Sequence, residues 1–124
     1  MDLKSYFEST KGIGVLSTAD AQGQVDSAIY ARPHVMEEGT FAFIMLDRLT
    51  HANLQTNPRA AYLFIEEGVG YRGKRFFLTK IREEENSELM ERLRRRSTPG
   101  RSEETKFVGV FRIDKELPLI GAGE

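Results

Sequence analysis

The run from Asp47 to Phe64, DRLTHANLQTNPRAAYLF, carries the residue types of an anion-binding site at the start of a helix. Its polar first half has a helical pattern that Asn57-Pro58 ends, and Arg48, Thr50 and His51 stand at the beginning of that pattern. Phosphate binds to the free N–H groups and the dipole of a helix start, and an arginine beside them adds positive charge. A threonine at such a position also caps its own helix without any ligand. The stretch alone therefore favours capping by Thr50 and leaves a phosphate site open as the alternative.

A second arginine strengthens the phosphate interpretation. Arg32 ends the expected strand 25–32, and the expected strand 40–46 leads directly into the turn at Arg48. If these two strands pair or lie side by side, Arg32 comes close to Arg48 and Thr50. Two guanidinium groups, a hydroxyl and free helix N–H groups would then surround one small volume. We expect this arrangement to form a phosphate cradle.

Other kinds of site are poorly represented. His34 and His51 are the two histidines, and without cysteine they supply too few of the usual ligands for a zinc site. No serine stands in a nucleophile elbow, so no catalytic residue is identified and no metal site is expected. The glycine-rich stretch 68–73 lacks the spacing of a nucleotide-binding loop. The arginines between 92 and 101 are interleaved with glutamates, which favours a solvated helix face over a nucleic-acid surface.

Length and composition bound the remaining possibilities. The chain has 124 residues, of which 40% are hydrophobic and 30% charged, as is ordinary for one globular domain spanning 1–124. Its net charge of -1 gives no general attraction to nucleic acid or membranes. No apolar run approaches the roughly 20 residues of a membrane span, and the first residues lack the apolar core of a signal peptide. We therefore expect a cytoplasmic protein without a membrane or nucleic-acid partner.

The alternation of apolar residues predicts a mainly β protein with short helices. Strand patterns recur along the chain, and turn residues between them indicate that most neighbours are joined as hairpins. Such a succession predicts a six-stranded antiparallel split β-barrel, closed or partly closed. The tail 114–124 has no evident structure of its own, although 117–120 is apolar. The expected strands are 14–19, 25–32, 40–46, 59–65, 74–81 and 107–113, and the expected helices are 2–10, a short one after residue 48, and 86–96.

The order of these pieces resembles the FMN-binding split-barrel family related to pyridoxamine 5'-phosphate oxidase. A first hairpin, GIGVLSTADAQGQVDSAIYARPHV, is followed by GTFAFIMLDRLTHANLQTNPRAAYLF and GKRFFLTK. Gly39, Asn53-Leu54 and Asn57-Pro58 fall at the family's spacings, and the resemblance covers about residues 12–81. It implies a homodimer with two FMN sites at the subunit interface and the phosphate near the helix start. The residues that it places along the flavin, its ring and its phosphate are Ala28, Ile29, Tyr30, Arg32, Phe43, Ile44, Arg48, Leu49 and Thr50.

The chain departs from the oxidase at two points. Leu49 and Thr50 occupy the places of an Arg-Lys phosphate pair in the oxidase, although small FMN-binding members carry threonine at the second place and Arg48 restores one charge. The oxidase also has a C-terminal substrate segment with a tryptophan, and this chain contains no tryptophan. The resemblance therefore implies a flavoprotein other than pyridoxamine 5'-phosphate oxidase itself.

We expect a small FMN-binding flavoprotein, an oxidoreductase or electron-transfer protein with the flavin at a homodimer interface. In such a protein the flavin carries the chemistry, and Tyr30 and His34 are candidates for a catalytic role by position alone. The alternative is a split-barrel protein that holds haem, a deazaflavin or no cofactor, with His34 or His51 as the haem ligand. A single-stranded nucleic-acid module is disfavoured by the charge balance. The apolar tail 117–124 is expected to contact the partner subunit.

Overall fold

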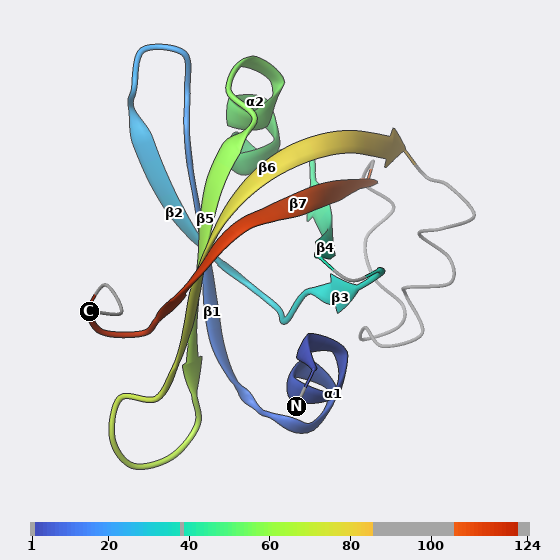
Figure 1. The fold of residues 1–124 in the computed structure, drawn as a ribbon. Coiled ribbons are helices and arrows are strands. Elements are labelled where there is room, and N and C mark those ends of the chain that lie inside the picture. The colour runs from blue at the N-terminus through green and yellow to red at the C-terminus, as the bar shows by residue number, and fades with distance from the viewer. Residues whose placement is uncertain (1, 38, 86–105, 122–124) are drawn as a thin grey trace.

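The computed structural model describes residues 2–37, 39–85 and 106–121, which form two short helices and seven strands (Figure 1). The mainly β architecture is as expected, but a two-residue strand, β3, follows the first hairpin, so the six-stranded prediction is corrected to seven. The expected helix 86–96 lies outside the described residues. Of the helices that the structure describes, neither is long and apolar enough to cross a membrane. The elements are α1 (Leu3–Ser9), β1 (Gly12–Ala19), β2 (Val25–Tyr30), β3 (His34–Val35), β4 (Thr40–Leu46), α2 (Leu49–Thr56), β5 (Arg59–Glu66), β6 (Gly73–Glu85) and β7 (Lys106–Pro118).

All seven strands belong to one sheet, in the order β2-β1-β5-β6-β7-β4-β3, and every neighbouring pair is antiparallel. β1 and β2 form the expected hairpin. The two edge strands, β2 and β3, do not pair with each other, so the sheet is rolled but not closed. In Figure 1 the strongly twisted strands cross near the centre, with α2 toward the upper end of the sheet and α1 toward the lower end.

Aromatic side chains fill the interior between the faces of this sheet. Phe7 reaches inward from α1 and is completely buried, with its ring edge-to-face against Phe41 and Phe64 at centroid distances of 5.5 and 5.2 Å. Phe41 packs in turn against Phe76 at 4.9 Å. Pairs of this geometry stabilise a fold by roughly 0.5 to 1.5 kcal/mol beyond the burial of their area. The core therefore fixes α1 firmly at its end of the sheet.

β6 and β7 run past the ends predicted for them at residues 81 and 113, since β6 continues to Glu85 and β7 to Pro118. The expectation that the chain after 113 has no structure of its own is therefore wrong as far as Pro118. Leu117 is buried opposite Arg75, whose guanidinium donates to the carbonyl oxygens of Pro118 at 2.9 Å and of Gly121. The residues past the predicted ends of both strands are mostly polar and lack the apolar alternation from which strands were predicted. The hydrogen-bond ladder between β6 and β7 nevertheless keeps these residues in the strands.

Candidate cofactor-binding site

The start of α2 has no side-chain cap. Arg48 is the N-cap residue and its side chain makes no cap hydrogen bond. Thr50 lies inside the first turn and is only 4% exposed, so the interpretation that it caps the helix is wrong. Its hydroxyl instead lies beside the phenol of Tyr30, where it acts to lower the pKa of that phenol against the larger effect of burial. Because the first N–H groups of any helix lack partners within it, α2 presents the kind of terminus that binds anions.

Tyr30 joins the end of β2 to β4 and α2. Its ring packs edge-to-face against Phe43 of β4, with centroids 6.0 Å apart and planes at 89°, while its hydroxyl meets Thr50. Burial raises the pKa of the Tyr30 phenol, so the group keeps its proton in neutral solution and remains a neutral hydrogen-bond donor. The structure therefore brings three of the predicted site residues together, and we call the place where Tyr30, Phe43 and Thr50 meet the α2 junction.

Beside the α2 junction lie two strand edges that pair with no other strand among the described residues. On one side β4 pairs with β7 along its whole length, but on the other side β3 pairs only with Phe41 and Ala42. Among the described strands, the edge of β4 from Phe43 onward and the outer edge of β2 have no partner. Backbone N–H and C=O groups along such an edge can hydrogen bond a ligand.

Arg32 does not belong to the α2 junction. β2 pairs with β1 and not with β4, so the pairing that would have placed Arg32 beside Arg48 is not formed. Nη1 of Arg32 donates to the carbonyl oxygens of Phe7 at 2.7 Å and Thr10 at 2.9 Å. These carbonyls end α1, where the negative end of the helix dipole attracts a cation. The expected cradle of two arginines is therefore corrected to Arg48 alone, and Arg32 ties α1 to the end of β2.

The predicted ring contacts on β4 point in opposite directions. The side chain of Phe43 is buried in the aromatic core, whereas Ile44 lies on the other face of the strand. Since successive residues of a strand alternate between faces, the two side chains cannot meet one ligand together. A ligand along this edge would contact both residues through their backbone. The buried residues against which Ile44 packs are Ala42, Val108 and Val110.

The other predicted residues surround the junction without forming one cluster. Ala28 is half-buried on the inner face of β2, and Ile29 is 72% exposed on the outer face. Arg48 and Leu49 are exposed at the start of α2, next to Thr50. Arg48 thus places a positive charge at the helix start.

His51, in the first turn of α2, is buried in a cluster that the sequence did not reveal. Its Nε2 lies 2.8 Å from a carboxylate oxygen of Glu83, and its Nδ1 lies 3.3 Å from one of Asp47. The ring also stacks on Phe107 of β7, with centroids 3.7 Å apart and planes at 13°. Because both ring nitrogens face carboxylates, the geometry does not favour His51 as a haem ligand.

A β-bulge in β6 places Glu83 against His51. The register of β6 with β7 shifts between Lys80 and Arg82, so that Ile81 is an extra residue. In a regular strand, residues three apart point to opposite faces. The bulge turns Lys80 and Glu83 to the same face, where Lys80 Nζ lies 3.0 Å from Glu83 Oε1. No strand periodicity in the sequence indicates such a change of face.

Glu83 is held as an anion. Burial alone would raise the pKa of its carboxyl, but hydrogen bonds from His51, Lys80 and Gln55 and the charge of Lys80 outweigh burial and lower the pKa below its ordinary value. The amide of Gln55, one turn along α2 from His51, donates to Glu83 Oε1 at 3.2 Å. This carboxylate therefore connects two residues of α2 to β6.

Comparison with known structures identifies the fold. A solved FMN-binding protein from Syntrophomonas wolfei subsp. wolfei matches with a TM-score of 0.77 at 21% identity, over 95% of this chain and 84% of that one. HutZ, the haem storage protein from Vibrio cholerae, matches with a TM-score of 0.68 at 18% identity over 100% of both chains. An F420 reductase matches with a TM-score of 0.68 at 17% identity, over 94% of this chain and 97% of that one. No family model and no curated protein matches the sequence.

The chain has the FMN-binding split-barrel fold. The resemblance read from the sequence is thereby confirmed at the level of the fold. Proteins with this split barrel include binders of FMN and of haem, so the fold by itself does not decide the ligand.

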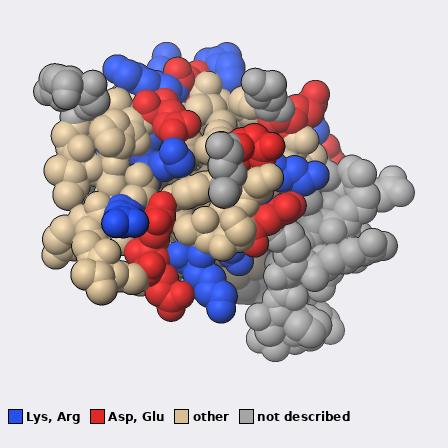
Figure 2. Space-filling view, turned by 60° about the horizontal axis from the view of Figure 1, so that its bottom comes forward, with Lys and Arg blue, Asp and Glu red and all other residues tan. Residues whose placement is uncertain are grey.

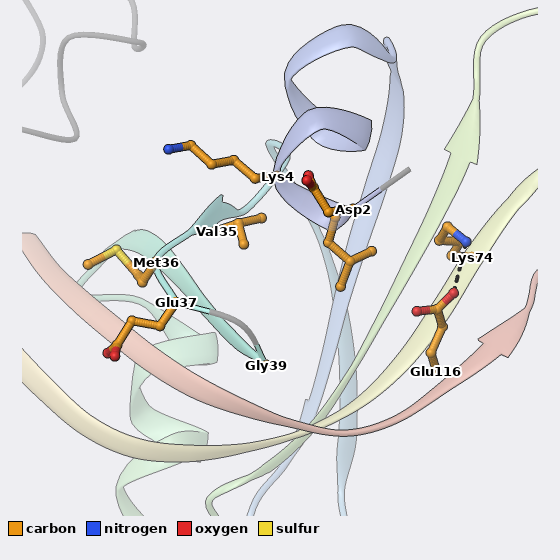
Figure 3. A pocket seen from close by; sticks show the side chains of 9 residues that line it. Asp2, Lys4, Val35, Met36, Glu37, Gly39, Lys74 and Glu116 are labelled. Atoms are coloured by element: carbon orange, nitrogen blue, oxygen red, sulfur yellow. Dashed lines mark hydrogen bonds and ion pairs between the residues drawn. The ribbon is translucent and has the colours of Figure 1, made fainter.

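A cavity of about 520 Å³ opens at the end of the split barrel away from α2, between α1, the β3–β4 turn and the ends of β6 and β7 (Figure 3). Lys74 on its wall lies 2.8 Å from a carboxylate oxygen of Glu116 and 5.2 Å from the ring centre of Tyr6. The cavity has no residue in common with those predicted for the cofactor. It is lined by Asp2, Leu3, Lys4, Val35, Met36, Glu37, Gly39, Lys74 and Glu116.

The surface of the split barrel shows no segregation of charge on the face drawn in Figure 2. Lysine and arginine side chains are interspersed with aspartate and glutamate among the described residues. A nucleic-acid surface normally gathers basic residues into one patch or stripe. The described residues on this face form no such patch.

Proposed function

We propose that this split barrel binds FMN, with the phosphate at the start of α2 and the flavin ring along the free edge of β4. The observation that carries the proposal is the α2 junction, where a helix start without a side-chain cap, the neighbouring side chains of Tyr30 and Thr50, and an unpaired strand edge come together. The likeness of the fold to an FMN-binding protein supports the choice of ligand.

The donors at the start of α2 suit a phosphate. Arg48 supplies positive charge, and the first N–H groups of the helix supply hydrogen bonds. The hydroxyl of Thr50 is the side-chain donor that we assign to the phosphate, and the phenol of Tyr30 lies beside it. Leu49 adds an apolar contact in place of the second charge that the oxidase has. The chain would thus hold the phosphate with one arginine, one hydroxyl and backbone groups.

The flavin ring would lie where β2 and β4 lack strand neighbours. The backbone of Phe43 and Ile44 offers N–H and C=O groups on the open edge of β4. Ala28 and Ile29, beside Tyr30 on β2, would border the chain between phosphate and ring. In this placement the ligand contacts the backbone of Phe43 and Ile44. Both residues can therefore bind the same ligand although their side chains point to different faces.

When bound, FMN supplies the redox chemistry, and the proposed role of the chain is that of an oxidoreductase or electron-transfer protein. The residues of the α2 junction bind and orient the cofactor and exclude water from one side of it. Tyr30 acts there as a hydrogen-bond donor rather than a base, because burial raises the pKa of its phenol.

We further propose that the split barrel is a homodimer. The outer face of β2, β1 and β5 carries an apolar stripe, in which Ile29 lies opposite Val15 and Val15 opposite Leu63. Ile29 and Ile13 on this face are 72% and 58% exposed. Contiguous exposed apolar residues of this kind mark interfaces, and a second copy of the same stripe matches it by two-fold symmetry. The stripe continues to the edge of β2, so the partner subunit would lie next to the flavin.

Haem is the second candidate ligand, because the fold is also that of a haem storage protein. A deazaflavin is a variant of the flavin proposal that the likeness to an F420 reductase supports. Neither structural similarity identifies a ligand-binding residue of this protein. The engagement of both ring nitrogens of His51 by carboxylates disfavours this histidine as the haem ligand, so the haem alternative rests on His34.

An absorption spectrum of the purified protein, before and after addition of FMN or haem, separates these candidates. The proposal predicts flavin bands that stay with the protein through gel filtration. A Soret band with no retained flavin would establish the haem alternative, and retention of neither ligand would contradict both.

A further inference from the structure

The cluster around His51 holds α2 on a different side from the one that Thr50 faces. Thr50 and His51 are consecutive, so their side chains leave the helix roughly 100° apart. Thr50 is directed to Tyr30 at the end of β2, whereas His51 is directed to Glu83 on β6 and Phe107 on β7. The first turn of α2 is therefore fixed between the two parts of the sheet that lie on either side of it.

Three polar side chains face the ring of His51. Its Nδ1 lies 3.3 Å from a carboxylate oxygen of Asp47, and its Nε2 lies 2.8 Å from one of Glu83 and 3.1 Å from Nε2 of Gln55. Lys80 Nζ lies 3.0 Å from the other carboxylate oxygen of Glu83. The ring thus stands between Asp47, directly before the helix start, and Glu83 on β6.

We propose that His51 is a positioning residue for the cofactor phosphate: paired with Glu83 and stacked on Phe107, it sets the place of the first turn of α2, and its Nδ1 faces Asp47 directly before the helix start. This inference rests on the proposed function, because it concerns the phosphate end of the same site. In this proposal the residues around His51 raise the affinity for FMN without contacting the ligand themselves.

The bulge at Ile81 supports this role independently. If β6 were regular between Lys80 and Glu83, these residues, three apart, would point to opposite faces of the strand. Bulges of this kind commonly re-aim a side chain next to a functional site. Of the two register shifts between β6 and β7, the one at Ile81 brings a carboxylate to His51.

The experiment compares dissociation constants for FMN and riboflavin, which differ by the phosphate, in the full chain and three variants. His51→Phe keeps a ring to stack on Phe107 but removes both nitrogens, and Glu83→Gln keeps the shape of the partner but removes its charge. Each should weaken FMN binding about tenfold, the equivalent of one charge-assisted hydrogen bond, and leave riboflavin binding within about twofold. Glu84→Gln is the matched control, because Glu84 is adjacent on β6, pairs with Arg82 at 3.4 Å and should change neither constant.

The double variant His51→Phe with Glu83→Gln should bind FMN no more weakly than the weaker single variant, since both changes break the same pair. The ¹⁵N spectrum of the imidazole groups gives a reading that does not depend on the ligand. With two histidines in the chain, the signal of His51 is assignable by comparison with His51→Phe. Because the ring is stacked on Phe107, this signal should move in Glu83→Gln, where the ring loses its charged partner, and stay in place in Glu84→Gln.

The possible outcomes separate this inference from the proposed function. If the wild type binds FMN and riboflavin equally, the phosphate site fails and the inference fails with it. If the wild type prefers FMN and both single variants keep the full preference, the phosphate site stands and the positioning role is overturned. Equal loss of both ligands in the variants would also overturn it, because His51 would then support the fold rather than the phosphate end.

Discussion

Substitution of the two arginines that the sequence grouped together should have different consequences. Arg48 stands exposed at the start of α2, where we place the phosphate, whereas Arg32 is bonded to the end of α1. Arg48→Ala should therefore weaken FMN binding without affecting the fold. Arg32→Ala should weaken the fold without affecting the preference for FMN over riboflavin.

The magnitudes follow from the contacts. A hydrogen bond to a charged group is worth about 1.5 to 3 kcal/mol, and because Arg48 is exposed we take the lower end, which corresponds to roughly a tenfold loss of FMN affinity. Arg32 makes two part-buried bonds, to the carbonyls of Phe7 and Thr10, whose joint loss should cost about 2 kcal/mol of unfolding free energy. A domain of 124 residues has an unfolding entropy of about 260 cal/mol/K, so the Tm of Arg32→Ala should fall by about 8 °C.

Fluorescence titration with FMN and with riboflavin, together with a thermal melt of each variant without ligand, measures both effects. Riboflavin affinity should be unchanged in Arg48→Ala. The reasoning is refuted if Arg32→Ala loses the FMN preference at an unchanged Tm, because Arg32 would then face the phosphate after all. It is equally refuted if Arg48→Ala binds FMN as tightly as the wild type.

Three further substitutions test the charges and the interface. Asp47→Asn removes an anion before the helix start and should tighten FMN binding about two- to fivefold, the effect of roughly 0.3 to 1 kcal/mol at an exposed site; weaker binding would count against a phosphate there. Ile29→Lys should give a monomer in light scattering, whereas Val69→Lys, on an exposed loop, should leave the dimer intact, and a dimeric Ile29→Lys would exclude the apolar stripe as the interface. The folded state lowers the pKa of Glu83, so its stabilising contribution is present above the ordinary carboxyl pKa and is lost as the pH falls through the lowered value. The difference in Tm between the wild type and Glu83→Gln should accordingly shrink from about pH 7 to about pH 3, and a constant difference would show that the charge of Glu83 does not matter.

The parts of the fold that the sequence predicted well are those with strong local signals. The alternation in β1 and β2 and the turn between them specify the first hairpin, and the apolar run of β4 followed by a polar stretch specifies the strand and α2. Asn57-Pro58 marks the end of α2 correctly, because the residue before a proline is kept from helical geometry.

The parts that were missed depend on contacts between distant segments. β3 is two residues long, too short for any periodicity, and exists only through its pairing with Phe41 and Ala42. The polar end of β6 is held as a strand by β7, and the bulge at Ile81 is a shift in the register between these two strands. The direction of Arg32 follows from the order of strands, which local patterns do not encode.

For the candidate site as well, local sequence features were predicted correctly and contacts between distant segments were missed. The position of α2 and the residues at its start followed from the polar run 47–57, so Arg48 and Thr50 were placed correctly at a helix start. The contact between Thr50 and Tyr30 joins α2 to β2, and the pair His51 and Glu83 joins α2 to β6; both need the folded sheet. A polar residue in the first turn of a helix gives no indication of its partner.

A crystal structure of the protein with FMN tests the central claim most directly. We predict the phosphate within hydrogen-bond distance of the first N–H groups of α2 and the hydroxyl of Thr50, with the flavin ring along the edge of β4 that begins at Phe43. A phosphate bound elsewhere, such as in the cavity beside Lys74 and Glu116, or the absence of FMN from crystals grown at saturating concentration, would contradict the account.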